Sequence, residues 1–349
     1  MDERRIFTPD DIKNGHTRPY KDLGLRGYEI FLEYVNNQYL EQLRMDMQGA
    51  PLAPTQCLIV VGSDGKRERH KQSKTDLVVV EQPHSDNLPI DGFVAWYGSV
   101  HPKQPFHEVF DLHSERMPQV ASLGNPDVPV SYAYPHLYRQ PARIYPDRIL
   151  NSMLVGGSDE VFKDARRQVL HEMTDIGKPS RYIREEMAMQ LKHYRKAIAS
   201  GTFRDIDVFS TDPPLQFYDE NPVSYSMGFK IPFLRSVQRY LDIVTTVAIR
   251  AGRLDLDEAV DTLPTSTVDR LNFMMNLGIL PANATTEKIR DSYLWFLQQY
   301  HYAQELYKGN REPVSLLFDQ EVFKSHQAVV IEFTSTGHYA KDMNVLSVK

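Results

Sequence analysis

Hydrophobic and polar residues along the first part of the chain predict a helix followed by two strands. In residues 27–47 apolar side chains recur every three or four positions, which is typical of an amphipathic helix; they are Ile30, Phe31, Tyr34, Val35, Leu40 and Leu43. Residues 57–61 and 77–80 are short, β-branched apolar runs, and such runs favour strands. We therefore expect the polar residues between these strands to form a loop that a sheet holds in place.

The pattern is less regular over the next hundred residues. Residues 92–100 and 108–114 have strand composition and would extend the sheet. Residues 125–146 are rich in Pro, Tyr and Arg without a period, which indicates a long ordered loop. Residues 146–158 begin with proline and end in glycines, which predicts a helix, and residues 159–173 predict the next one.

The second half of the chain is dominated by helical spacing. Apolar residues recur every three or four positions in five segments, which are residues 183–198, 233–248, 265–277, 286–307 and 319–333. The acidic, proline-containing residues 202–222 predict an irregular segment between two helices. The chain is thus predicted to be α+β, with a small mixed sheet and flanking helices over residues 1–177, a helical bundle over 178–333 and a C-terminal tail over 334–349.

Composition narrows the class of protein. The chain has 349 residues, 41% hydrophobic and 25% charged, which fits two globular domains. A formal net charge of −6 argues against a nucleic-acid binder driven by bulk electrostatics, with binding through a local basic patch as the alternative. The single cysteine, Cys57, lies in an apolar strand pattern, so we expect a buried thiol and no cysteine-based zinc site. No run reaches the ~20 apolar residues of a membrane span, and we expect a cytoplasmic protein.

Candidate chemistry gathers in the loop between the two predicted strands. Gly62 lacks a Cβ and Ser63 has a hydroxyl, so the backbone of this turn can approach a phosphate, while Lys66 and Arg67 add positive charge. Asp76, at the start of the second strand, could hold a Mg²⁺ ion that bridges the phosphates. A surface hairpin with solvated charges is the alternative.

The sequence in this loop is similar to a known signature. Gly62-Ser63-Asp64-Gly65-Lys66-Arg67-Glu68, followed by Ser73-Lys74-Thr75-Asp76-Leu77, resembles the nucleotidyltransferase superfamily, in the form found in PII-uridylyltransferases and in the nucleotidyltransferases that accompany CBS domains. The resemblance implies that the turn, with Gly62, Ser63, Gly65, Lys66 and Arg67, binds a nucleoside triphosphate. It also implies an Asp-x-Asp pair for Mg²⁺, in which Lys74 here replaces the first acid and Asp76 is the second.

The superfamily also uses a third carboxylate on a neighbouring strand. Asp111 is the candidate for this role as a metal-binding and catalytic residue, with Glu108 as the other acid of that segment. Successive side chains of a strand alternate between its faces, so at most one of the two faces the site. A solvated acid on an edge strand is the alternative for either residue.

A second basic position lies at the start of a predicted helix. Lys230 and Arg235 precede or open the helix of residues 233–248; a helix N-terminus already favours anions, so cations there indicate that something negative binds nearby. The segment resembles the Lys-x-x-x-Leu-Arg-x-Ile-Gln element with which these families begin their helical domain. An ordinary amphipathic helix with solvated charges is the alternative.

Two classes of function follow. The first is a Mg²⁺-dependent transferase that moves a nucleoside monophosphate onto a hydroxyl of a protein or small molecule. The second is a non-catalytic relative that binds a nucleotide or a protein partner and regulates. Lys74 separates them, because an ammonium in place of a carboxylate removes negative charge where the cation would bind. We expect the fold to be retained and transfer to be weak or lost.

Overall fold

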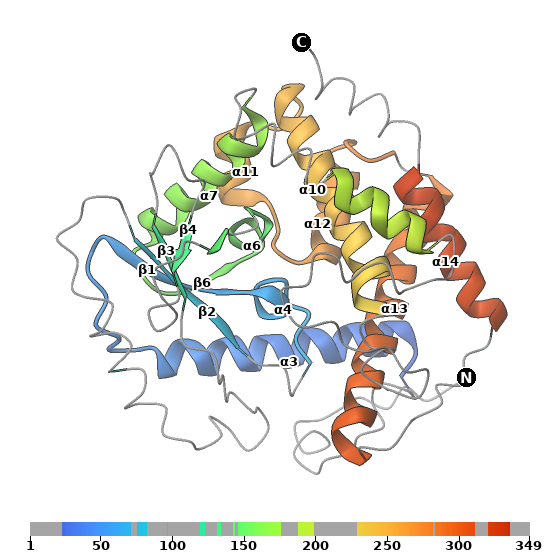
Figure 1. The fold of residues 1–349 in the computed structure, drawn as a ribbon, viewed down its shortest axis with the longest axis horizontal. Coiled ribbons are helices and arrows are strands. Elements are labelled where there is room, and N and C mark those ends of the chain that lie inside the picture. Colours follow the sequence, from blue (N-terminus) through green and yellow to red (C-terminus); the bar gives the residue numbers. More distant parts are fainter. Residues whose placement is uncertain are drawn as a thin grey trace.

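The protein places a sheet beside a bundle of helices, and one long helix runs along both (Figure 1). The computed structural model describes residues 23–70, 75–81, 96, 119–122, 131–133, 142–143, 146–175, 188–198, 229–281, 283–310 and 320–335. Strands and helices occur together in these ranges, so the predicted α+β class is confirmed. None of the helices found there has the length and apolar character needed to cross a bilayer.

The described strands form one six-stranded mixed sheet in the order β5-β4-β3-β2-β1-β6. The strands are β1 (Gln56–Val61), β2 (Asp76–Glu81), β3 (Gln119–Ser122), β4 (Ser131–Ala133), β5 (Ala142–Arg143) and β6 (Met153–Gly157). β1 pairs antiparallel with both β2 and β6, whereas β2 and β3 are parallel. Both strands predicted from the apolar runs are confirmed, and β1 is buried along its whole length.

Two predictions between residues 125 and 158 are wrong. The helix expected over residues 146–158 ends early, because α6 spans Pro146–Leu150 and β6 follows it as a strand. The backbone of β6 forms hydrogen bonds with the edge of β1. Pairing of these backbone groups outweighs the local fit of the segment to a helix. The expected loop over residues 125–146 contains β4 and β5, whose lengths of three and two residues are too short to leave a period in the sequence.

The predicted strands over residues 92–100 and 108–114 fall almost entirely outside the described residues. Of these two segments the structure describes Trp96, which is helical, so the strand is not borne out at that position. Asp111 and Glu108 both lie outside the described part of the chain.

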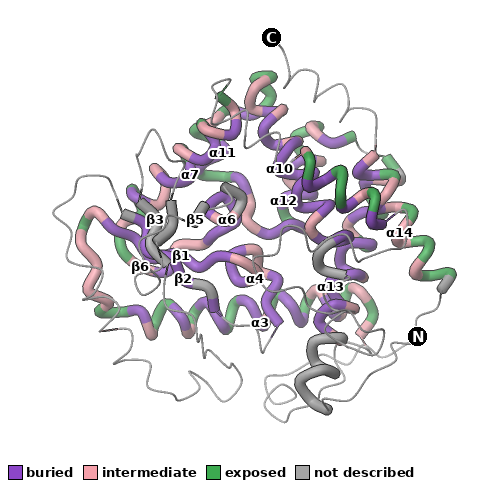
Figure 2. Tube along the Cα trace, viewed as in Figure 1, coloured by how far each residue is buried: buried purple, intermediate pink, exposed green. Residues whose placement is uncertain are grey.

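Helix α3 (Leu25–Asp46) confirms the first predicted helix and connects the two parts of the protein. Its buried face is formed by Tyr28, Phe31, Leu32, Val35, Tyr39, Leu40 and Leu43. Ile30, which the periodicity assigned to the apolar face, is 59% exposed because it lies on the opposite side of the helix. Figure 2 shows this alternation of buried and exposed positions along α3.

The remaining helices agree with the predicted segments. They are α7 (Asp159–Thr174), residues 188–198, η2 (Phe229–Leu234), α10 (Arg235–Arg250), α12 (Thr267–Asn276), α13 (Ala284–Asn310) and α14 (Gln320–Ser335). The pattern missed α11 (Leu256–Thr262), which has seven residues. η2 is π-helical and contains Pro232. Proline lacks an N–H and crowds the preceding turn, which disfavours the regular α-helical hydrogen bonds at this point.

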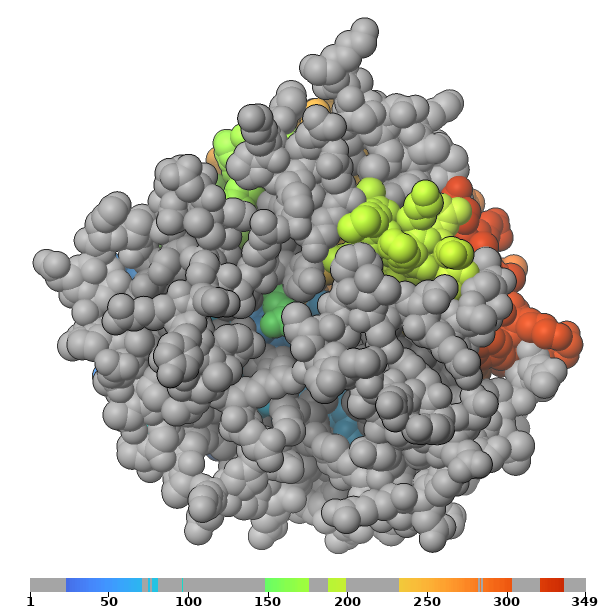
Figure 3. Space-filling model, viewed as in Figure 1, coloured from blue at the N-terminus to red at the C-terminus, as the bar shows by residue number. Residues whose placement is uncertain are grey.

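Helix 188–198 packs against α14 on the surface of the bundle. Arg195 donates to Ser335 Oγ over 2.7 Å, and Gln327 donates to the carbonyl oxygen of Ile198 over 2.7 Å. The two helices lie next to each other on the molecular surface in the space-filling view (Figure 3). The boundary predicted near residue 177 falls outside the described residues and stays a prediction.

Candidate functional site

The predicted phosphate turn and the predicted metal ligand meet at one end of the sheet. Gly62 follows the last residue of β1, and the first residue of β2 is Asp76. In the β1–β2 register Val61 pairs directly with Asp76, so the turn begins beside that acid. Gly62 has a φ of +73°, a left-handed conformation that glycine adopts without strain. The charged loop between β1 and β2 thus begins and ends at adjacent residues of a buried sheet.

The turn itself is a short helix, α4 (Gly62–Gly65), packed closely on its own chain. A Cβ on Gly65 would lie 2.2 Å from the carbonyl oxygen of Asn151 and 2.8 Å from that of Val60. The missing side chain of Gly65 therefore lets α4 dock on the turn between α6 and β6. Ser63 is half-buried, and Asp64 and Gly65 are buried.

A buried ion pair fixes the loop that follows α4. Arg69 Nη1 lies 2.7 Å from Asp64 Oδ1, and the exposed fractions of their side chains are 0% and 1%. The guanidinium lies over the Tyr39 ring, 3.9 Å from its centroid. The Tyr39 hydroxyl is 2.9 Å from Thr75 Oγ1 and 3.2 Å from Asp64 Oδ2. Because Thr75 immediately precedes Asp76, this cluster also positions the start of β2.

Burial has a clear electrostatic effect in this cluster. It raises the pKa of Tyr39 well above the usual value, and the Asp64 charge raises it further, whereas Arg69 opposes the shift. The phenol therefore stays protonated and remains a hydrogen-bond donor. A surface hairpin with solvated charges is excluded for Asp64 and Arg69.

Glu68 connects the same loop to the helical bundle. Its carboxylate accepts from the hydroxyls of Thr267 (2.6 Å) and Tyr293 (2.5 Å) and from the Gln238 amide (3.1 Å). Its carbonyl oxygen accepts from His301 Nε2 over 3.0 Å. These partners lie on α10, α12 and α13, so one carboxylate from the motif joins three helices to the sheet.

The two predicted phosphate-binding cations point in different directions. Lys66 Nζ donates to Gln238 Oε1 over 2.6 Å, which brings the ammonium to α10. Arg67 Nη2 donates to Asn37 Oδ1 on α3 over 2.6 Å. Arg67 also has a φ of +58°, a conformation that is uncommon outside glycine.

Arg235 is the first residue of α10 and is half-buried. Lys230 lies in η2, where the structure describes its backbone. Gln238 follows Arg235 by three residues, and positions three apart lie on the same face of a helix. The loop cation Lys66 and the helix cation Arg235 are therefore brought to one face of α10.

The remaining predicted residues are only partly described. Asp76 is placed by its backbone in β2, while Lys74 and Asp111 lie outside the described residues. Among the residues that are described, no group of three or more His, Cys, Asp or Glu side chains could hold a metal ion. The sequence itself places Lys74 two positions before Asp76, which lowers the local negative charge.

A second buried ion cluster supports the site from the other side. Asp242 of α10 accepts from Arg270 (3.0 Å) and Arg239 (3.3 Å). Arg270 also donates to the side-chain oxygen of Asn151, the residue whose carbonyl oxygen lies against Gly65. α10 and α12 are thus tied to the α6–β6 turn that supports α4.

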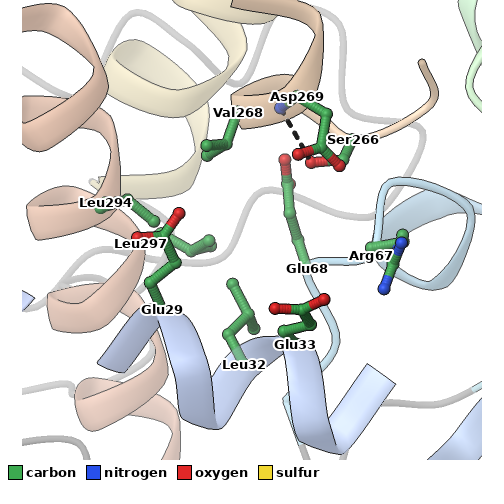
Figure 4. Close-up of a pocket in the computed structure, with 10 residues that line it drawn as sticks. All are labelled: Glu29, Leu32, Glu33, Arg67, Glu68, Ser266, Val268, Asp269, Leu294 and Leu297. Atoms are coloured by element: carbon green, nitrogen blue, oxygen red, sulfur yellow. Dashed lines mark hydrogen bonds between the residues drawn. The ribbon is translucent and has the colours of Figure 1, made fainter. Parts of the chain in front are cut away.

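A cavity of about 100 Å³ lies next to this loop, between α3, α12 and α13 (Figure 4). Carboxylates outnumber cations among its lining side chains, which include Glu29, Glu33, Asp269 and Arg67. This charge disfavours a triphosphate, so we do not place a nucleotide there. The cavity reaches the predicted site at Arg67 and Glu68. The other predicted nucleotide-binding residues that the structure describes do not line it, and they are Gly62, Ser63, Gly65, Lys66 and Arg235.

The sequence missed the residues that join the loop to the bundle. Glu68 is part of the quoted signature, but no local pattern distinguishes Thr267 and Tyr293 from other residues of amphipathic helices. The chain matches no known protein family, and no curated protein is detectably similar to it in sequence. The likeness to nucleotidyltransferases therefore rests on the motif residues themselves.

Proposed function

We propose that the protein binds a nucleoside triphosphate at the β1–β2 end of the sheet and that nucleotidyl transfer is weak or lost. The observation that carries the proposal is the pairing of Val61 with Asp76. It sets a left-handed Gly62 turn, suited to a phosphate, beside an acid suited to a phosphate-bridging cation. The position of the Lys66 ammonium on α10 further supports an anionic ligand between the loop and that helix.

Replacement of a carboxylate by Lys74 is the reason for assigning weak transfer. Phosphoryl transfer with magnesium depends on clustered negative charge that holds the cation against the phosphates. An ammonium at this position repels that cation and can itself pair with a phosphate oxygen. The protein then binds the triphosphate as a ligand and acts as a regulatory relative of the transferases.

The binding proposal is tested by calorimetry with ATP, GTP, CTP and UTP, each with and without Mg²⁺. A double variant, Ser63→Ala with Lys66→Met, removes the hydroxyl of the turn and the ammonium that reaches α10. We expect it to bind more weakly than the parent. A control, Arg167→Ala, removes a charge from an ion pair on the surface of α7 and should leave binding unchanged. Failure of all four nucleotides to bind would refute the proposal.

Catalysis is tested by restoring the acidic pair with Lys74→Asp. The substitution restores the Asp-x-Asp pair that binds Mg²⁺ in the nucleotidyltransferases that the motif resembles, so Mg²⁺ affinity and triphosphate turnover should rise above those of the parent. The parent should show little Mg²⁺ affinity and little triphosphate turnover. Asp76→Ala, which removes the remaining acid of the pair, is the matched control. High Mg²⁺-dependent activity in the parent, lost in Lys74→Asp but kept in Asp76→Ala, would show that the metal site is elsewhere.

A further inference from the structure

The Lys66 ammonium is bound by a residue that is distant in sequence. Its Nζ lies 2.6 Å from Oε1 of Gln238, which is 172 positions away. Gln238 is buried and lies one helical turn beyond Arg235 on α10. The contact brings a flexible cation from the loop to the basic start of this helix.

The side-chain amide of Gln238 has a defined orientation. Its Nε2 donates to Glu68 Oε2 over 3.1 Å and to the Tyr293 hydroxyl oxygen over 2.7 Å. An ionised carboxylate accepts hydrogen bonds and donates none, so the amide nitrogen must face Glu68. The amide oxygen is then left to face Lys66. A flipped amide would set oxygen against carboxylate and NH₂ against ammonium.

Glu68 is in turn held by two helices. Thr267 of α12 and Tyr293 of α13 both donate to its Oε1. Burial and the Glu68 charge raise the pKa of Tyr293 well above its usual value, so this hydroxyl remains a donor at neutral pH. The orientation of Gln238 is therefore set by Glu68 and Tyr293, the two groups to which its amide nitrogen donates.

We infer that Gln238 is a positioning residue for the triphosphate site: it holds the Lys66 ammonium against the first turn of α10, one helical turn from Arg235, before the ligand arrives. The inference rests on the proposed function. An ammonium has three donors, so its bond to Gln238 is compatible with another to a phosphate oxygen. Ordering the lysine during folding lowers the entropic cost of binding.

The test is a double-mutant cycle read as the Kd of a triphosphate. The parent, Lys66→Met, Gln238→Met and the double variant are titrated with the nucleotide that binds the parent most tightly. We expect Gln238→Met to weaken binding between about two- and tenfold, which is the effect of immobilising one flexible side chain. In the Lys66→Met background, Gln238→Met should have no further effect, because there is no ammonium left to position.

Thr267→Val is the matched control. It removes one of the two donors to Glu68 Oε1 and leaves Glu68 and Tyr293, the two direct partners of the Gln238 amide nitrogen, in place. Stability should therefore fall while the Kd stays at the parent value. An equal loss of affinity in Thr267→Val would overturn the inference, since general loosening would then explain both variants. If Gln238→Met does not fold, Gln238→Asn, which is one methylene shorter and cannot span both partners, should weaken binding in the same way.

Two further results separate the inference from the proposed function. Weaker binding in Lys66→Met with parent-like binding in Gln238→Met would overturn the role of Gln238 and leave the nucleotide site standing. No binding of any triphosphate to the parent would overturn both the proposed function and the role of Gln238, because Lys66 would then have no phosphate to bind.

Discussion

Replacing Arg69 by methionine should destabilise the protein strongly. Arg69 and Asp64 are buried, with exposed side-chain fractions of 0% and 1%, and their charged atoms lie 2.7 Å apart. Methionine keeps much of the side-chain volume but leaves the Asp64 carboxylate without its cation. Removing one partner of a buried ion pair costs about 3–5 kcal/mol. A protein of ordinary stability has only about 5–15 kcal/mol to lose.

The assay is urea unfolding followed by circular dichroism, with the free energy of unfolding extrapolated to water. Asp64→Asn combined with Arg69→Met removes both charges, and this double variant should be more stable than Arg69→Met alone. As a control, Arg167→Met breaks a solvent-exposed ion pair with Asp257 and should leave the midpoint close to that of the parent.

A loss below about 1 kcal/mol in Arg69→Met, the size expected of an exposed pair, would refute this reasoning. It would mean that water reaches Asp64 or that the loop rearranges to solvate it. A double variant less stable than Arg69→Met would also contradict it, because the remaining carboxylate could not then be the source of the cost.

Three further changes have expected outcomes. Gly65→Ala forces a Cβ against two backbone oxygens and should cost about 1–3 kcal/mol or more in urea unfolding, whereas Gly24→Ala, in open space, should be neutral; equal effects would contradict the packing of α4. Tyr293→Phe removes a donor to the buried Glu68 carboxylate and should cost about 1.5–3 kcal/mol; unchanged stability would show that this bond adds little. Burial raises the pKa of Cys57 from its ordinary 9.0 to about 12, so the folded protein keeps a proton that the unfolded chain releases. Stability should therefore fall as pH rises from about 9 towards 12, and a Cys57→Ala variant should lack this part of the pH dependence.

The sequence by itself determined most of the regular structure. Strands β1 and β2 and the helices α3, α7, α12, α13 and α14 were predictable because burial of one face imposes a period on nearby residues. The β1–β2 loop was also identifiable as the candidate site, since glycine, serine and basic residues gather between two apolar runs. All of these signals come from residues close together in the chain.

Other features were decided by the tertiary structure. Residues 153–157 fit a helix locally, and they form β6 because the edge of β1, almost a hundred residues earlier, offers unpaired backbone groups. The segment 62–70 looks like a solvated loop, yet Asp64, Glu68 and Arg69 are buried in it.

The partners of these buried charges explain the difference. Arg69 pairs with Asp64 within the loop and packs on Tyr39 of α3, while Glu68 and Lys66 bind residues of helices that lie more than 160 positions away. A charged side chain can leave water only when a partner replaces its hydration. For Glu68 and Lys66 that partner is supplied when the helical bundle docks on the loop, and no local pattern in the sequence records it.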